Sequence, residues 1–240
     1  MRYHTLDSLR GLALVNMIGY HFCYDLRYLY RLPLSFMDGR SGFCWQQAIC
    51  WTFILVSGAS FSLSRHPARR GAVVFCCGML LTAVTLAVMP QQRIIFGVLH
   101  LLGCAMLLTA LLRPYLSRIP PCAGAVGSFL LFWGSYWLSA GRLFGVQIFD
   151  PQGVSGNLLA PLGIYGPGFY SSDYFPLLPW YFLFLCGGFL FALLRRREEG
   201  RLLALRVPLL AAAGRHTLPV YLVHQPVLLG VCLILLGQMP

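Results

Sequence analysis

The sequence has 240 residues, of which 58% are hydrophobic and 10% are charged, and its mean hydropathy is +0.70. A water-soluble domain typically carries about 25% charged residues, so no water-soluble fold of this length could bury so much apolar surface. The formal net charge is +11. Every positively charged side chain is an arginine, which excludes a lysine Schiff base. In such an apolar chain, excess arginine first indicates membrane topology rather than nucleic-acid binding.

Apolar runs predict an all-α integral membrane protein, with a single domain over residues 1–240 and about seven transmembrane helices. A helix needs about 20 apolar residues to cross a bilayer. The predicted spans are 8–29, 43–64, 71–89, 94–112, 121–140, 176–194 and 214–236. The first run contains His21 and Asp25, and no Ala-x-Ala cleavage site follows it. We therefore expect the N-terminus to stay attached rather than to be removed as a signal peptide.

The arginines divide unequally between the predicted loops. If the N-terminus is cytoplasmic, 13 of the 18 arginines lie on the cytoplasmic side. The outer side then keeps Arg27, Arg31, Arg40, Arg93 and Arg142. The positive-inside rule thus predicts a cytoplasmic N-terminus and an outer C-terminus. We expect the basic connection at 195–206 to be a cytoplasmic loop that faces anionic lipid.

The longest connection, residues 141–175, lies on the predicted outer side and is rich in glycine, proline and aromatic residues. Long loops in compact proteins are usually lids, binding loops or disordered segments, and this loop is too apolar for a solvated linker. We expect it to fold back over the outer mouth of the helix bundle as a lid. The nine cysteines lie mostly in apolar runs without a CxxC pair, and we interpret them as small apolar fillers.

A polar stripe runs along the first predicted helix. The eleven residues from Arg10 to His21 turn a helix through about three turns plus 20°, so the two side chains share a face. Asp7 precedes Arg10 by about one turn, and Asp25 follows His21 by about one turn. Ionisable groups that face lipid cost several kcal/mol, so these residues line a cavity or pair with other helices. In the alternative interpretation, Arg10 only sets topology while His21 and Asp25 tie helices together.

Arg10 and His21 are separated by about 16 Å along the predicted helix. Arg10 lies near the inner membrane surface and His21 in the outer half. A single ligand that reached both would have to be long, and anionic at its inner end.

Four segments together resemble a known family of membrane enzymes. The opening LDSLRGLALVNMIGYHFCYDL is similar to the first-helix signature of transmembrane acyltransferases. FGVLHLLG at 96–103, DYFPLLPW at 173–180 and GRHTLPVYLVHQP at 214–226 resemble the heparan-alpha-glucosaminide N-acetyltransferase catalytic-domain-like family. The four segments occur in the family's order over nearly the whole chain.

This resemblance implies a polytopic enzyme of a bacterial cytoplasmic membrane that takes acetyl groups from cytoplasmic acetyl-CoA to an acceptor across the membrane. The lysosomal relative acetylates the terminal glucosamine of heparan sulfate. We expect two departures from that relative: no lumenal domain before the catalytic part, and no histidine between Tyr24 and Arg65 to match the one just beyond the relative's first helix. Heparan is therefore not the expected substrate.

Further histidines fall within the predicted spans. His100 lies between two glycines at a predicted depth similar to that of His21, which suggests an acid/base pair. The alternative is a hydrogen bond between helices. His224 and Gln225 precede Pro226, which removes a backbone hydrogen bond and kinks a helix, and we expect both to face the cavity as substrate-binding residues.

Arg215 and His216 lie at the predicted cytoplasmic entrance of the last span. Gly214 precedes a helix N-terminus there, which suits phosphate. The alternative is an ordinary interfacial cap.

Aromatic and acidic residues open the sixth predicted span on the outer side. Asp173, Tyr174 and Trp180 suit a sugar, because a carboxylate accepts hydroxyl or amine hydrogens while an aromatic ring covers the apolar face. The competing interpretation is an aromatic belt with a helix N-cap. The family resemblance favours substrate binding.

The combined prediction is an acyltransferase that uses acyl-CoA as cosubstrate and requires no metal. Arg10, Arg215 and His216 would hold the phosphates of acyl-CoA. His21 or His100, with Asp25 as orienting group, would deprotonate an amine or hydroxyl of a carbohydrate acceptor. Direct transfer and an acetyl-histidine intermediate both stay open. The expected partners are membrane lipid, acyl-CoA and the acceptor, with no nucleic acid.

Two other functions are compatible with this pattern. A proton-coupled small-molecule transporter also needs buried ionisable residues and a proline-broken helix, although no inverted repeat is visible. A catalytically inactive membrane subunit would be marked by loss of Arg10, His21 or His100, and all three are present.

Overall fold

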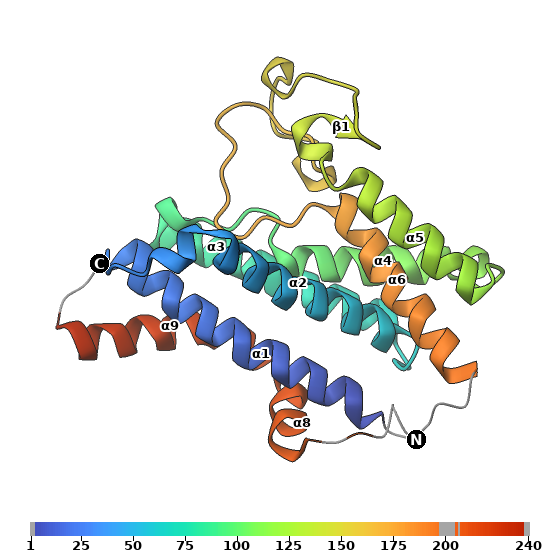
Figure 1. The fold of residues 1–240 in the computed structure, drawn as a ribbon, viewed down its shortest axis with the longest axis horizontal. Helices are drawn as coiled ribbons and strands as arrows, with labels where there is room; N and C mark the ends of the chain where they lie inside the picture. Colours follow the sequence, from blue (N-terminus) through green and yellow to red (C-terminus); the bar gives the residue numbers. More distant parts are fainter. Residues whose placement is uncertain (1–2, 197–204, 206, 238–240) are drawn as a thin grey trace. The chain divides into compact units, whose positions relative to one another are not determined.

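The structure is a computed structural model that describes residues 3–196, 205 and 207–237 (Figure 1). Helices make up most of the described chain. They are α1 (His4–Tyr24), α2 (Arg40–Phe61), α3 (Pro67–Val88), α4 (Val98–Leu116), α5 (Pro121–Ser135), α6 (Leu177–Arg196), α8 (Pro208–Arg215) and α9 (Thr217–Leu236). The chain divides into two compact units: unit 1 is Met1–Val56 with Glu199–Pro240, and unit 2 is Ser57–Glu198.

Unit 1 is built around α1, which contacts both α8 and α9. Its apolar core contains buried Leu14 and Met17 from α1 and Ile49 from α2. The α-helical part of α1 ends at Tyr24 and continues as a single π-helical turn, Asp25–Leu29, in which Tyr30 N–H donates to the Asp25 carbonyl at 3.0 Å. Turns of this kind are rare inside proteins and often mark functional sites.

Two glycines let α1 and α8 approach backbone to backbone. A Cβ atom at Gly11 would lie 1.9 Å from the carbonyl oxygen of Leu210, and one at Gly214 would lie 1.9 Å from the carbonyl oxygen of Asp7. Any larger residue would therefore push the helices apart. This crossing brings the α8–α9 junction to the N-terminal part of α1.

Unit 2 contains two close helix pairs, α3 with α4 and α5 with α6, and α4 also contacts α6. A Cβ atom at Gly103 would lie 2.6 Å from the backbone nitrogen of Phe75, so glycine is required where α4 crosses α3. Fully buried side chains in the core include Leu101 from α4, Phe132 from α5 and Phe184 from α6.

The connection between α5 and α6 contains a short antiparallel hairpin, β1 (Arg142–Leu143) and β2 (Val146–Gln147), and the 3-10 turns Pro151–Gly153 and Ala160–Leu162. Its last residues dock within unit 2: the Ser171 hydroxyl accepts from Ile95 N–H at 2.8 Å, and Phe175 N–H donates to the Phe96 carbonyl at 3.0 Å. The part before this docked segment lies beyond the ends of α5 and α6 (Figure 1). Closure of the loop over the bundle stays a prediction.

The helices α1–α6 follow the first six predicted spans in chain order, and α9 follows the seventh. A separate helix, α8, precedes α9 and was not predicted, because its eight residues are too few to form a spanning run. Four described helices are long and apolar enough to cross a membrane: Pro67–Val88, Val98–Leu116, Leu177–Arg195 and Thr217–Leu236. The helix α5 has 15 residues, fewer than the run of 20 residues predicted at 121–140. Seven transmembrane spans, with a cytoplasmic N-terminus and an outer C-terminus, therefore remain a prediction.

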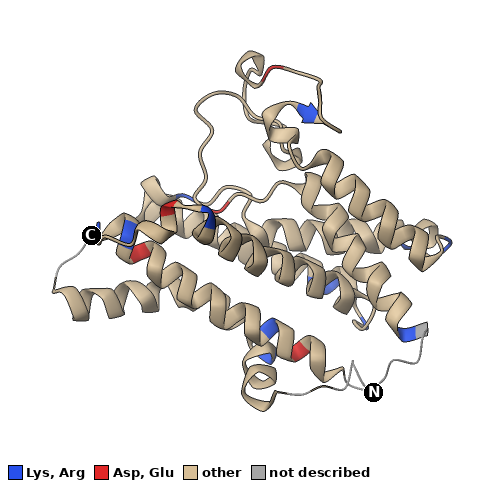
Figure 2. Ribbon diagram, in the orientation of Figure 1, with Lys and Arg blue, Asp and Glu red and all other residues tan. Residues whose placement is uncertain are grey.

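Charged residues are sparse along most of the described helices (Figure 2). Many blue and red segments lie in loops or near helix ends, as expected when the middle of a helix crosses lipid. The predicted basic connection 195–206 falls largely outside the described residues, as do Arg2, Arg197, Arg201 and Arg206.

Candidate active site

Four polar side chains predicted as site residues meet in unit 1, at the C-terminal end of α1. Asp25 is fully buried, with 0% exposure. The Gln225 amide nitrogen on α9 contacts both carboxylate oxygens of Asp25, at 2.8 and 2.9 Å. The neighbouring His224 packs its ring edge-on against His21, with 4.9 Å between ring centroids. Residues about 200 positions apart in the sequence thus form one cluster.

The Asp25 carboxylate contacts α9 rather than the His21 ring that it was predicted to orient. The carboxylate accepts hydrogen bonds from Gln225, and within the described chain no hydrogen bond joins it to the His21 ring. The His21 ring contacts Tyr20 and His224 instead, and His21 is partly exposed. A residue four positions onward shares a helix face, but its side chain turns to whichever partner the neighbouring helix supplies.

The orientation of the His224 ring is defined by the backbone of its own helix. Nδ1 lies 2.6 Å from the carbonyl oxygen of Tyr221. Because a carbonyl can only accept, Nδ1 must carry the hydrogen, and in the neutral ring Nε2 is an acceptor. This Nε2 atom is buried and has no hydrogen-bond partner among the described residues.

Three buried side-chain atoms lack a hydrogen-bond partner in the part of the chain that the structure describes: Tyr30 Oη, His224 Nε2 and Gln225 Oε1. All three belong to unit 1, and two are consecutive residues of α9. Buried polar atoms are normally paired, so such groups point to a catalytic or ligand-binding role or to bound water. Sequence analysis missed Tyr30, because it follows the end of the predicted helix and carries no periodic signal.

In α9, a proline directly follows His224 and Gln225. Pro226 inside α9 has no N–H, so the carbonyl of Leu222 lacks its helical donor. Next to it, α9 contacts both α1 and the π-helical turn. That His224 and Gln225 bind substrate stays a prediction.

Aromatic residues continue the polar stripe of α1 beyond the histidine. The Tyr24 and Tyr28 rings lie 4.6 Å apart, and Tyr20 packs edge-on against Trp45 of α2 at 5.5 Å. Within the π-helical turn, Arg27 forms an ion pair with Asp38 at 2.7 Å. Hydrogen bonds from Arg27 and Tyr28 lower the pKa of the Asp38 carboxyl below its usual value.

The predicted phosphate-binding residues gather near the N-terminal part of α1. The Arg10 guanidinium contacts the Asp7 carboxylate at 3.1 Å, and both side chains are largely buried. Arg215 ends α8, and His216 stands between α8 and α9; both are exposed. Because Gly214 packs on the Asp7 backbone, the structure brings Arg215 and His216 to the same part of unit 1 as Arg10.

His100 in unit 2 has a complete set of hydrogen bonds. It is 3% exposed, and its Nδ1 accepts from Gly97 N–H, just before α4, at 3.2 Å. Its Nε2 lies 3.3 Å from the Thr82 hydroxyl, which itself donates to the Ile94 carbonyl. Nε2 is therefore the donor, and both ring nitrogens are occupied. This arrangement ties α3 to the start of α4, as in the helix-tying alternative.

Asp173 also binds the start of α4. Its Oδ2 accepts from Val98 N–H at 3.1 Å, and a Cβ atom at Gly97 would lie 2.4 Å from the same oxygen. A carboxylate is favourable at a helix N-terminus. The competing prediction of an N-cap is thus observed, but the capped helix is α4 rather than α6.

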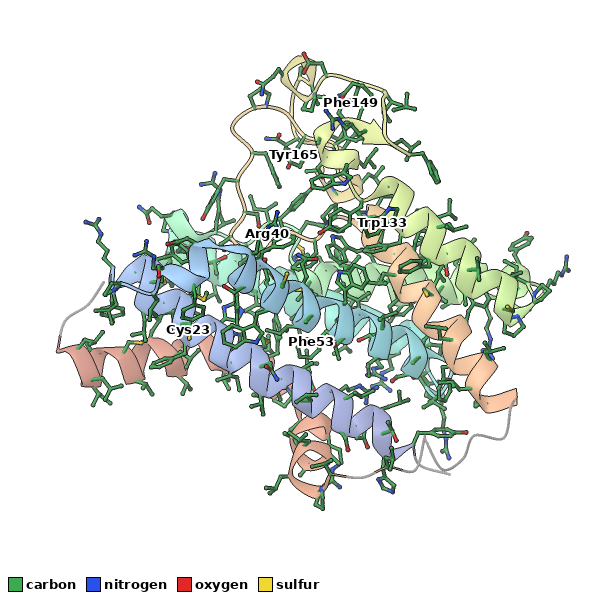
Figure 3. All side chains as sticks on the ribbon, in the orientation of Figure 1. Cys23, Arg40, Phe53, Trp133, Phe149 and Tyr165 are labelled. Carbon is green, nitrogen blue, oxygen red and sulfur yellow. The ribbon has the colours of Figure 1, made fainter. Side chains whose placement is uncertain are left out.

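The aromatic residues of the DYFPLLPW segment are packed inside unit 2. The Tyr174 hydroxyl donates to the Ala160 carbonyl at 2.6 Å, and burial raises the pKa of this phenol. Tyr165, labelled in Figure 3, packs edge-on against Tyr174 at 5.3 Å. Trp180 is 7% exposed and contacts Phe132 and Phe175. Tyr174 therefore secures the loop, and Trp180 belongs to the core.

Comparison with protein families identifies a family that covers most of the chain. The family described as "Heparan-alpha-glucosaminide N-acetyltransferase, catalytic" matches residues 2–226, which confirms the resemblance of the four segments. No curated protein and no solved structure matches the chain. Within the described residues, no group of three or more histidine, cysteine or acidic side chains is placed to hold a metal ion.

Proposed function

Because the chain belongs to the heparan-alpha-glucosaminide N-acetyltransferase catalytic family, we propose that it is a membrane-embedded acyltransferase. It moves an acetyl or other short acyl group from cytoplasmic acyl-CoA to an amine or hydroxyl of a sugar or glycan on the outer side. Four described helices capable of crossing a membrane support an integral membrane location. The bacterial cytoplasmic membrane is the proposed compartment.

The observation that carries this proposal is the distribution of polar groups along α1. One part holds Arg10, with Arg215 and His216 close to it through the α1–α8 crossing. At the C-terminal end of α1, His21 and the following Asp25 meet His224 and Gln225 of α9. The two parts are about 16 Å apart along the helix. A long cosubstrate with phosphates at one end and a thioester at the other fits this separation.

In the proposed reaction, Arg10, Arg215 and His216 bind the phosphates of acyl-CoA. The amine or hydroxyl of the acceptor attacks the thioester carbonyl carbon, and the carbon–sulfur bond breaks. His21 accepts the proton of the nucleophile and returns it to the departing thiolate. Gln225 contributes an unpaired acceptor oxygen, Oε1, that suits the hydrogens of an amine or hydroxyl, and His224 lies beside it on α9.

Unit 2 has a supporting role in this proposal. Asp173, Tyr174 and Trp180 hold the start of α4, the long loop and the core of this unit. Their assignment to acceptor binding is kept as part of the proposal. His100 was predicted as an alternative base. Its two occupied nitrogens favour His21 for that role.

The orientation is tested with topology reporters. A reporter fused after Pro240 should lie outside the cytoplasm, and one inserted near Gly200 should be cytoplasmic, because 13 of the 18 arginines lie on one predicted side. A cytoplasmic C-terminus would exclude the topology with seven spans and a cytoplasmic N-terminus.

The activity is tested on the protein purified in detergent, with labelled acetyl-CoA and a panel of amino sugars and hydroxylated glycans. Transfer of label to an acceptor supports the proposal. Parallel uptake assays in proteoliposomes test the transporter alternative. Uptake driven by a proton gradient, without transfer of label, would show that the protein is a carrier rather than an enzyme.

A further inference from the structure

We propose that His224 is the positioning residue of the site: its Nε2 accepts the ring N–H of His21 and so fixes the tautomer in which the other His21 nitrogen is the base. The inference rests on the proposed acyltransferase function. It assigns to His224 the orienting role that the sequence suggested for Asp25.

The hydrogen-bonding groups of the two rings are complementary, and this supports the pairing of His21 with His224. His224 has a buried acceptor, Nε2, without a partner among the described residues. Within the same described part of the chain, the His21 ring makes no hydrogen bond, although its centroid lies 4.9 Å from that of His224. A neutral imidazole has one N–H to donate, so each ring supplies what the other lacks. In a free enzyme such catalytic bonds are often long and tighten when substrate binds.

The Tyr221 carbonyl makes the arrangement directional. It accepts Nδ1–H of His224 at 2.6 Å, so the neutral His224 ring cannot offer a hydrogen at Nε2. His21 must then be the donor of the pair. A base oriented by a second group, which is itself held by a third, is the general arrangement of activated catalytic groups.

Asp25 is unsuited to the same task in this structure. Both of its carboxylate oxygens contact the Gln225 amide nitrogen, at 2.8 and 2.9 Å. This contact fixes the residue next to His224 on α9 against the π-helical turn. Asp25 therefore contributes to the placement of His224 through Gln225 rather than by contact with His21.

The proposed step balances without any further reactant. The acceptor nitrogen or oxygen forms a bond to the acyl carbon as the carbon–sulfur bond breaks. The proton of the nucleophile moves to the free nitrogen of His21, giving an imidazolium whose second N–H is donated to His224 Nε2. The thiolate of CoA then takes a proton from His21, which restores the starting tautomer.

Two substitutions at position 224 separate the two ring nitrogens. His224→Gln places an amide near the position of Nε2 and can still accept a hydrogen bond, whereas His224→Asn reaches only to the position of Nδ1. We expect His224→Asn to lower kcat by on the order of 10²- to 10⁴-fold with KM for acetyl-CoA unchanged. His224→Gln should retain activity within about tenfold of wild type. Equal activities of the two variants would overturn the proposal.

A double-mutant cycle provides the decisive measurement. If His224 acts through His21, adding His224→Asn to His21→Asn should change the residual rate by less than about threefold, because groups that act as a unit are not additive. An independent structural role would instead multiply the two losses, and that result would reject the inference. Bound labelled acetyl-CoA and thermal unfolding in detergent, measured for each variant, identify any protein that has not folded.

The matched control is His66→Asn, because His66 is exposed in unit 2 and lies outside the proposed machinery. It should match wild type in rate and in binding. If wild-type protein transfers no acyl group to any acceptor, the proposed function fails. If wild type is active and the cycle is additive, only the role of His224 fails.

Discussion

Buried histidines in the two units have opposite hydrogen-bond environments. In unit 2, His100 uses both ring nitrogens, one for Gly97 N–H and one for the Thr82 hydroxyl. In unit 1, His224 uses one nitrogen and leaves the other buried without a partner among the described residues, while the adjacent His21 ring makes only ring contacts there.

This difference distinguishes buried polar groups that stabilise the fold from those that are available for function. A buried polar group with all its partners stabilises one arrangement of helices, whereas an unpaired one costs free energy unless a ligand or water completes it. In the sequence, the histidines of the two units look the same, because each lies inside an apolar helix. Their environments predict opposite responses to substitution: loss of turnover in unit 1 and loss of stability in unit 2.

The largest expected effect is at His21. His21→Ala should lower turnover by about 10²- to 10⁴-fold while acyl-CoA still binds, because a general base contributes that much to the rate. His21→Asn should fold normally but stay inactive, since asparagine cannot shuttle a proton at neutral pH. Single-turnover transfer of labelled acetyl groups measures the effect. Near wild-type transfer by His21→Asn, together with loss of transfer in His100→Asn, would make His100 the base.

The next largest effect is expected on acyl-CoA binding by Arg10, in the N-terminal part of α1. Arg10→Ala should weaken acyl-CoA binding by roughly 10- to 150-fold, the range expected for loss of a charge-assisted hydrogen bond. Arg10→Lys should restore little of it, because the planar guanidinium donates several hydrogen bonds that an ammonium cannot reproduce. Calorimetry with CoA in detergent checks both variants. Wild-type affinity in folded Arg10→Ala would exclude a donor site at this part of α1.

A stability effect is expected at His100. His100→Leu removes the bonds to Gly97 and Thr82 and should destabilise the protein by about 1–3 kcal/mol, because buried partners are left unpaired. The turnover of the folded fraction should stay close to wild type. Thermal unfolding and transfer rates on the same preparation separate the two quantities. A loss of turnover without a loss of stability would contradict the comparison between the units.

The smallest effect is expected at Asp173. Asp173→Ala should cost about 1 kcal/mol, the typical value for loss of a helix cap, while Asp173→Asn keeps an acceptor for Val98 N–H and should cost less. The acceptor KM of Asp173→Asn gives a second readout. A large rise in that KM with unchanged stability would establish the carboxylate as a substrate ligand, as the sequence suggested.

The sequence alone was sufficient to predict helices and family. Apolar runs of spanning length follow from the thickness of the bilayer, so most helix positions could be read directly from composition. The period of the α-helix placed Arg10 and His21 on one face, and the four segments identified the family. The ion pair between Arg10 and Asp7 is also a local contact, three residues apart, and such contacts follow from helix geometry.

The tertiary structure decided which groups meet across helices. Contact between His21 and His224, the pairing of Gln225 with Asp25, and the cap that Asp173 places on α4 join residues about 75 to 200 positions apart. Such contacts depend on where helices cross, and crossings depend on details such as Gly11 and Gly214, where a single Cβ atom would separate two backbones. Helical periodicity determines the face on which a residue lies, but only the packing of a second helix against that face determines its partner.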